Sequence, residues 1–305
     1  MISQISKDKL GPQYASMKEP IETCVHCGFC LPTCPTYSTM GDEMNSPRGR
    51  ILLMKETLEG KMNPSEIDPF VDNCLGCLAC VTSCPSGVEY GELISPYRSW
   101  SEKQRDRGIL GRLQRFALLK TIPYPNRFRV ASKLASAFKP VAPYLPKSFG
   151  AMIELAPSQL PEKQSYDQLY PAEGSRRGRV ALLIGCAQQA LAPKINQAAI
   201  NVLARNGIEV LVPKSQGCCG SLAMHIGASK EAQAAAKKNF EAFPDDVDAI
   251  ISTAAGCGSG MKEYGTLFAG ADQEIADQAK AFSAKVQDIC TYLNKVGCTP
   301  PEDSE

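Results

Sequence analysis

Two cysteine runs provide the residues of this chain that are best suited to redox chemistry. Residues 24–35 read CVHCGFCLPTCP and residues 74–85 read CLGCLACVTSCP, so both follow the pattern C-x2-C-x2-C-x3-C-P. Three cysteines at this spacing can wrap a short loop around a [4Fe–4S] cubane, and soft thiolates suit iron–sulfur chemistry. In proteins with two such runs, the fourth cysteine of each run ligates the other cluster. The sequence therefore predicts two clusters with crossed ligand sets.

The crossed pattern assigns four cysteines to each cluster. The first is predicted on Cys24, Cys27, Cys30 and Cys84, and the second on Cys74, Cys77, Cys80 and Cys34. A structural zinc site is the alternative, but the repeated 2-2-3 spacing with a following proline favours clusters. Disulfides are disfavoured, since residues 1–10 are polar and lack the apolar core of a secretory signal. We therefore expect reduced thiols in a cytoplasmic protein.

The composition is that of a globular protein with room for two domains. The chain has 305 residues, of which 44% are hydrophobic and 21% charged, and its formal net charge is +1. No stretch approaches 18 uninterrupted apolar residues, so no membrane-spanning helix is expected. The small net charge hides a basic segment, because residues 98–150 hold 12 basic and 2 acidic side chains.

This basic segment is predicted to contain two amphipathic helices, at residues 109–120 and 127–138, with prolines around them. Such helices can lie on an anionic membrane surface, dock on an acidic partner subunit, or pack within the chain and present a solvated basic face. Nucleic acid is not expected as a partner, because no recognised binding motif accompanies the charge. We interpret residues 98–177 as a basic, proline-broken helical connector between two domains.

The C-terminal part alternates buried strands with helices. Strands are predicted near residues 179–186, 208–213 and 248–253, and helices at 194–206 and 229–243. One further helix is predicted from residue 276 to residue 296. Strands that alternate with helices indicate an open parallel α/β sheet, in which sites lie beyond the carboxyl ends of the strands.

Four more cysteines follow these predicted strands and are candidates for a third redox site, with or without a cluster. They are Cys186, Cys218, Cys219 and Cys257. The alternative is that they are buried and act as small apolar residues. The glycines at 256, 258 and 260 lack the spacing and the acidic partner of a dinucleotide loop. No flavin or nucleotide fingerprint is present, so no catalytic residue is predicted.

The remaining candidates are isolated residues. His26 lies inside the first cysteine run, where it either tunes a cluster by hydrogen bonding or is exposed. His225 follows the Cys218-Cys219 turn, and it either faces the third site or is a core histidine. Cys290 and Cys298 have no motif spacing and are interpreted as structural.

Taken with these motifs, the sequences SPRGR at 46–50, CPSGV at 84–88, CCG at 218–220 and GCG at 256–258 resemble the family of glycolate oxidase iron–sulfur subunits. The resemblance implies a multidomain α and α/β protein. After a tail at 1–19, an α-helical two-[4Fe–4S] ferredoxin domain would span residues 20–97. A cysteine-rich CCG domain with a parallel α/β sheet would span residues 178–299, followed by a tail at 300–305.

The resemblance also implies a function and partners. FAD-containing glycolate oxidase subunits would oxidise glycolate to glyoxylate. The present chain, without flavin or substrate, would pass the electrons to a membrane-surface or quinone-linked acceptor at the inner face of the cell membrane. Iron–sulfur subunits of anaerobic glycerol-3-phosphate dehydrogenase, of lactate-utilisation systems and of heterodisulfide reductase have the same parts. They are the alternative functions, the last with chemistry at the CCG site.

Two features depart from the pattern of the family. Its members carry two CCG modules, whereas this chain ends after one, so we expect either a truncated chain or a second module on another polypeptide. In the heterodisulfide reductase relatives a CCG module ends in C-x2-C and binds a non-cubane cluster. Here Gly260 stands at that last position, which leaves four cysteines.

Overall fold

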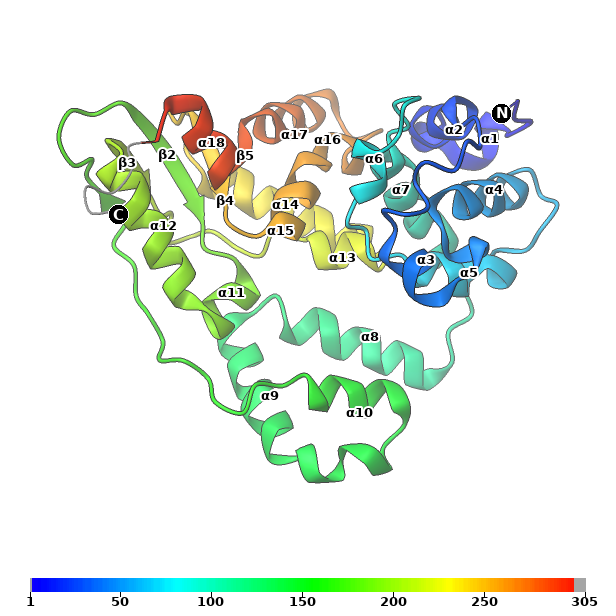
Figure 1. Ribbon diagram of the computed structural model, residues 1–305, viewed down its shortest axis with the longest axis horizontal. Helices are drawn as coiled ribbons and strands as arrows, with labels where there is room; N and C mark the ends of the chain where they lie inside the picture. Colours follow the sequence, from blue (N-terminus) through cyan, green and yellow to red (C-terminus); the bar gives the residue numbers. More distant parts are fainter. Residues whose placement is uncertain (1, 299–305) are drawn as a thin grey trace. The chain divides into compact units, whose positions relative to one another are not determined.

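The computed structural model describes residues 2–298, and the chain forms two compact units (Figure 1). The first unit contains the chain up to Arg107 together with Ser221–Gln233 and Lys262–Ser283. The second contains Gly108–Gly220, Ala234–Met261 and the chain from Ala284. The N-terminal part is helical and the later part holds a mostly parallel sheet, so the predicted fold class is confirmed.

The first unit is built from short helices. They are α1 (Lys7–Leu10), η1 (Gly11–Gln13), α2 (Tyr14–Thr23), α3 (Pro35–Met40), η2 (Glu43–Asn45), α4 (Pro47–Leu58), α5 (Pro64–Asp72), α6 (Ala79–Thr82), α7 (Tyr90–Glu102), α13 (Ser221–His225), α16 (Tyr264–Leu267) and most of α17 (Gln273–Lys285). Helix α14 (Ser229–Ala242) begins in this unit. The local sequence explains where such helices begin, as α4 illustrates. In α4 the Ser46 hydroxyl caps the helix by accepting from the Gly49 N–H, and Pro47 occupies the first turn.

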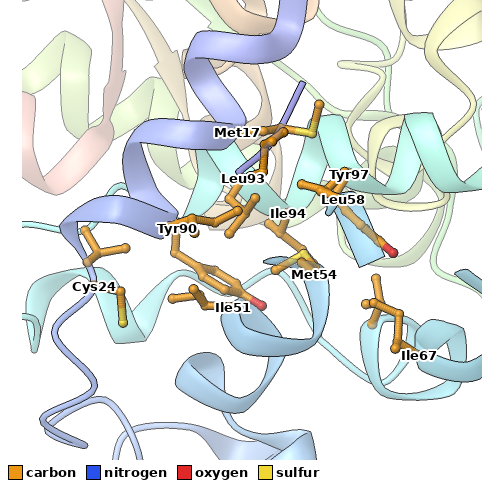
Figure 2. Packing of buried hydrophobic residues seen from close by; sticks show 14 of the residues in the cluster. Met17, Cys24, Ile51, Met54, Leu58, Ile67, Tyr90, Leu93, Ile94 and Tyr97 are labelled. Atoms are coloured by element: carbon orange, nitrogen blue, oxygen red, sulfur yellow. The ribbon is translucent and has the colours of Figure 1, made fainter. Parts of the chain in front are cut away.

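The core of the first unit is formed by helices that precede, connect and follow the two cysteine runs. Figure 2 shows Met17 of α2, Met54 of α4 and Leu93 of α7 in this core, and all three are fully buried. Cys24 and Tyr90 lie at its edge and are also buried. The cysteine loops are therefore attached to a packed helical scaffold, which fixes their positions.

The second unit contains a five-stranded sheet. Its strands are β1 (Leu169–Tyr170), β2 (Gly178–Leu183), β3 (Ile208–Leu211), β4 (Ala249–Ser252) and β5 (Val286–Asp288), in the order β1-β3-β2-β4-β5. Only β1 is antiparallel to its neighbour. Central β2 pairs Val180 with Val210 on one side and with Ala249 on the other. The chain leaves β2 for β3 on one side and later returns to β4 on the other, so the strand order reverses at β2.

Helices complete the second unit. They are α8 (Ile109–Thr121), α9 (Pro125–Ala137), η3 (Lys139–Tyr144), α10 (Lys147–Glu154), α11 (Cys186–Leu191), α12 (Pro193–Arg205), the end of α14, α15 (Ala255–Lys262) and α18 (Ile289–Val296). Ile200 and Leu203 of α12 and Tyr292 of α18 pack in one core with Val180 and Val210 of the sheet. The strands are aliphatic and fully buried at their centres, which is typical of parallel strands covered by helices.

The predicted single helix at residues 276–296 is wrong. Helix α17 ends at Lys285, the chain then forms β5, and α18 begins at Ile289. Val286 is buried and pairs with Ile250 of β4, so sheet pairing overrides the helical pattern of the flanking residues. The Asp288 carboxylate then accepts from the Cys290 N–H and caps α18.

The basic segment divides into two groups of residues. Arg98 is buried in α7 and donates to the carbonyl oxygens of Val71 and Cys74. Arg105 pairs with Asp68 and Asp72, so it too holds the first unit together. Arg107 pairs with Glu102 at the end of α7, and Lys103 directly follows this helix. The remaining basic residues of the segment lie on α8, α9, η3 and α10. No described helix is long and apolar enough to cross a membrane.

The apolar faces of α8 and α9 are exposed. Ile109, Leu113 and Phe116 of α8 have exposed fractions of 88%, 58% and 60%, and Val130 and Leu134 of α9 have 59% and 58%. No residue of α8 is buried. The interpretation of these stripes as intramolecular core is therefore wrong for the described residues.

Candidate iron–sulfur centres and a thiol site

The two cysteine loops share one unusual backbone conformation. In the first loop His26 and Gly28 have φ of 58° and 87°, and in the second Gly76 and Leu78 have φ of 65° and 57°. These are the same positions of the motif, two and four residues after the first cysteine. His26 and Leu78 are the only non-glycine residues with positive φ within residues 2–298. Left-handed conformations are costly for side chains, and they persist where the surroundings enforce them, commonly at functional sites.

The first loop lines a hollow of about 410 Å³, named here the first site. Its sulfur-bearing residues include the four cysteines predicted for the first cluster, and Cys84 is the one that comes from the second run. Cys80 also borders this hollow, and Pro47, Ile51 and Tyr90 form apolar walls. The structure thus brings together the residues that the sequence assigned to the first cluster.

The second loop lines a hollow of about 320 Å³, named here the second site. Cys74, Cys77 and Cys80 come from the second run, and Cys34 comes from the end of the first. Cys34 is absent from the lining of the first site, and Cys84 is absent from that of the second. Cys80, Pro47 and Tyr90 border both hollows, so only a thin layer of side chains separates the sites.

Helix α4 contributes one arginine side chain to the lining of each site. Arg48 donates from Nη1 to the carbonyl oxygen of His26 at 3.0 Å and lines the first site. Arg50, with an exposed fraction of 1%, lines the second site. It donates from Nε to the Phe70 carbonyl at 2.7 Å and from Nη2 to the Thr36 hydroxyl at 3.0 Å, and its Nη1 lies 3.9 Å from the Cys34 sulfur. The sequence contained both arginines, but no local pattern revealed their targets.

Burial and hydrogen bonding shift the pKa of the cysteine thiols in opposite directions. Burial raises the pKa of Cys24 and Cys30, and burial together with neighbouring thiols raises that of Cys80 to about 12. At Cys34 burial also opposes ionisation, but hydrogen bonds from the Thr36 hydroxyl and the nearby backbone, with the charge of Arg50, bring the pKa below its usual value. Ionised sulfur at these positions requires a positive partner.

The donor set fits iron–sulfur clusters. The first site is lined by its four predicted cysteine ligands and by Cys80, and the second by its four predicted ligands. Both hollows have largely apolar walls, as cluster ligation requires. Within residues 2–298, no three histidine, cysteine or carboxylate side chains meet closely enough to hold a single metal ion. The Tyr90 hydroxyl lies 3.8 Å from the Cys74 sulfur, where it can donate to a thiolate ligand.

The two histidines lie beside the two loops. His26 belongs to the first loop, and its buried Nε2 has no hydrogen-bond partner among the described residues, so its role in tuning a cluster stays a prediction. His225 of α13 lies against Gly76, since a Cβ added to Gly76 would be 2.5 Å from the His225 ring. His225 therefore packs on the second cysteine loop, a position that the sequence analysis missed.

Glu263 is a second residue near this loop that the sequence analysis missed. Its Oε2 accepts from the Ser95 hydroxyl at 2.7 Å, and Oε1 would be 3.0 Å from a Cβ on Gly91. A Cβ on Gly91 would also be 3.4 Å from Leu78 of the second loop. Burial is the main cause that raises the pKa of Glu263 to about 7, and the nearby Glu92 adds to the effect.

Glu263 should make stability depend on pH. Its pKa rises from an ordinary value of 4.5 to about 7 in the folded chain, so the stability that this group contributes is fully present below pH 4.5 and is lost as pH rises through 7. The loss is at most about 3 kcal/mol. Glu263→Gln should reduce the drop in urea midpoint between pH 5 and pH 8. Glu241→Gln, at an exposed carboxylate, is the control, and an equal drop in wild type and Glu263→Gln would contradict this assignment.

The four remaining motif cysteines meet in the second unit. Cys186 follows β2, Cys218 and Cys219 follow β3, and Cys257 lies on α15 after β4, so all lie beyond the carboxyl ends of parallel strands. The sulfurs of Cys186 and Cys218 are 3.4 Å apart. Cys219 interacts with the thiols of both Cys218 and Cys257. We call this group the thiol site.

Side-chain amides hold the thiol site in place. Gln216 accepts from the Ile184 N–H at 2.9 Å and donates to the Leu182 carbonyl at 3.1 Å, which ties the loop after β3 to the end of β2. Fully buried Asn239 accepts from the Gly217 N–H and donates to the Cys218 carbonyl. The hydrogen bond with Cys218 lowers the pKa of Cys186, whereas the same contact raises that of Cys218. Cys290 and Cys298 lie elsewhere and are exposed.

Family models match two separate regions of the chain. A "4Fe-4S dicluster domain" model matches residues 20–88, and a "Cysteine-rich domain" model named CCG matches residues 180–262. The chain is therefore similar to the class of iron–sulfur proteins that join a dicluster domain to a CCG domain, and both domains fit an electron-transfer role. Within this class, the resemblance to the glycolate oxidase iron–sulfur subunit is confirmed by curated relatives.

Three relatives illustrate this similarity. The glycolate oxidase iron–sulfur subunit of Escherichia coli is 36% identical over 90% of this chain and 66% of its own length. The probable glycolate oxidase iron–sulfur subunit of Bacillus subtilis is 33% identical over 88% and 64%. Lactate utilization protein A of Geobacillus thermodenitrificans is 31% identical over 39% and 48%. The chain thus spans just under two thirds of the length of the first two. No solved structure matches it.

Proposed function

We propose that this chain is the iron–sulfur electron-transfer subunit of a flavin-dependent glycolate oxidase or dehydrogenase. The observation that carries the proposal is the presence of two cysteine-lined sites side by side, in a chain that is similar to glycolate oxidase iron–sulfur subunits over 90% of its length. FAD-containing subunits would oxidise glycolate to glyoxylate. This chain would take the electrons and deliver them to a membrane-surface or quinone-linked acceptor.

The ligand assignment is part of the proposal. Cys24, Cys27, Cys30 and Cys84 would hold one [4Fe–4S] cluster, and Cys34, Cys74, Cys77 and Cys80 the other. When bound, the clusters supply one-electron carriers whose potentials depend on charge, hydrogen bonds and burial. The chain itself contributes the positive charge of Arg50 and the Tyr90 hydroxyl at the second site, and apolar walls that limit water at both.

Lactate is the second candidate substrate of the complex. It is favoured by the similarity to lactate utilization protein A, which extends over 39% of this chain. Glycolate and lactate are both 2-hydroxy acids, so the same electron-transfer subunit would serve either flavoprotein. Glycerol-3-phosphate dehydrogenation and heterodisulfide reduction are the remaining alternatives.

Metal content and electron transfer test the proposed function together. Protein purified without oxygen should contain about eight irons and as many acid-labile sulfides. The isolated chain should not oxidise glycolate. After its copurifying flavoprotein is added, glycolate should bleach the visible absorbance of the clusters. Lactate and glycerol-3-phosphate serve as the competing substrates. Stoichiometric zinc without sulfide, or glycolate turnover by the chain alone, would refute the proposal.

The proposed membrane contact is made by α8 and α9. Both helices expose apolar side chains, and Arg112, Arg127 and Lys133 on the same helices are exposed cations. Cations beside an apolar stripe are the pattern of a helix that lies in the surface of an anionic bilayer. Arg129 is not part of this contact, because it donates to the carbonyl oxygens of Ala190 and Pro161 and so supports the fold.

Removing the three exposed cations should release the protein from lipid. The triple variant Arg112→Gln, Arg127→Gln and Lys133→Gln should bind vesicles that contain anionic phosphatidylglycerol about 100-fold more weakly, at about 1 kcal/mol per charge. Cosedimentation measures this. The control neutralises Lys194, Lys214 and Lys230, which are exposed elsewhere. Equal binding of both variants, or binding only to an acidic partner protein, would exclude the membrane contact.

A further inference from the structure

The sulfurs of Cys186 and Cys218 lie 3.4 Å apart, in direct contact with each other. A disulfide bond has a sulfur–sulfur distance of about 2.05 Å, so bond formation needs the two sulfurs to approach by about 1.4 Å. Both side chains are only partly buried, so a small thiol reagent can reach them.

The backbone around the pair is held on both sides. Gln216 ties the loop that carries Cys218 to the end of β2, from which Cys186 follows. Asn239 fixes Gly217 and the carbonyl of Cys218. These hydrogen bonds therefore hold the two cysteines beside each other at the carboxyl ends of neighbouring strands.

The other two cysteines of the thiol site are less suited to this bond. Cys219 is buried, with an exposed fraction of 3%. It also follows Cys218 directly, and neighbouring Cα atoms are about 3.8 Å apart, below the roughly 4.4–6.8 Å that is usual for disulfides. The direct hydrogen-bond partner of Cys257 is Cys219, and not Cys186 or Cys218.

We propose that Cys186 and Cys218 form a redox-active dithiol that closes reversibly to a disulfide by exchange with disulfides of the glutathione class. Closure removes two electrons and two protons from the two thiols and forms one sulfur–sulfur bond. Glutathione disulfide accepts them, its own sulfur–sulfur bond breaks, and two glutathione thiols are released. This site exchanges electrons in pairs and is separate from the eight cysteines of the proposed clusters, so it goes beyond the proposed function.

The test uses the full chain with its iron, kept without oxygen. Samples are equilibrated with a series of ratios of reduced to oxidised glutathione, alkylated in acid, digested and analysed by mass spectrometry. The expected result is a cross-linked pair of peptides carrying Cys186 and Cys218, which increases as glutathione becomes more oxidised and disappears when the series is reversed. Iron content is measured in parallel and should stay constant.

Variants separate the pair from its neighbours. Cys186→Ser and Cys218→Ser should each abolish the cross-link, whereas Cys219→Ser and the exposed-site control Cys290→Ser should keep it. Unchanged visible absorbance of each variant shows that the chain is folded. A cross-link through Cys219 or Cys257, no cross-link at any ratio, or a loss of iron in Cys186→Ser would each overturn the proposal. The iron content of the wild type, which tests the proposed function, does not depend on the cross-link.

Discussion

Replacing Cys34 by serine should remove the second cluster and leave the first in place. Cys34 lies next to the first loop in sequence, yet its side chain lines the second site together with Cys74 and Cys77. Because a cubane needs its fourth thiolate for stable binding, about four of eight irons should remain. Iron analysis and electron paramagnetic resonance of the reduced protein measure the outcome.

The reciprocal variant is the control for this experiment. Cys84→Ser should instead remove the cluster held by Cys24, Cys27 and Cys30, since Cys84 lines the first site. If Cys34→Ser lost the cluster of the first loop and kept that of the second, each run would hold its own cluster. The crossed assignment would then be wrong.

Replacing Arg50 by methionine should have the second large effect, on stability and on potential. Arg50 is fully buried, and among the described residues it forms no ion pair with a carboxylate. Its charge is instead directed toward Cys34. Loss of a buried charge partner typically costs about 3–5 kcal/mol. The Phe70 carbonyl and the Thr36 hydroxyl also lose a donor.

The potential distinguishes an electrostatic role of Arg50 from a purely structural one. Removal of a positive charge near the second site should make that cluster harder to reduce, so its midpoint potential should fall. Arg50→Lys, which keeps the charge but loses the planar fork, should lose stability with a smaller change in potential. Redox titration followed by electron paramagnetic resonance gives both values. A higher potential in Arg50→Met would contradict this role.

The parts that local sequence predicts are the cysteine loops and the central strands. Spacing alone identifies the loops, and short aliphatic runs identify β2, β3 and β4. Strand β5 was missed because Val286 follows thirteen helical residues, and only its pairing with Ile250 makes it a strand. A partner 36 positions away in sequence leaves no local signal.

The same limit applies to the sites. The roles of Arg48 and Arg50 depend on which carbonyls and sulfurs the fold places around α4, although the motif SPRGR was visible. His225 and Glu263 occur in sequence near the CCG motifs, and only tertiary packing brings them beside the second cysteine loop and Gly91. The exposed stripe of α8 shows a related limit, since an amphipathic pattern indicates a face but not what covers it.

The composition of the first unit restricts how this protein can have been assembled in evolution. Helix α7 is completed by chain from far downstream, because Ser95 donates to Glu263 and Ser99 contacts Ser229. A gene fragment that ended at Arg107 would encode every proposed cluster ligand but not these partners. Recombination that exchanged only the N-terminal part would therefore replace one side of these contacts and keep the other. The dicluster helices and the segments Ser221–Gln233 and Lys262–Ser283 therefore form one structural unit, although they are separate in the gene.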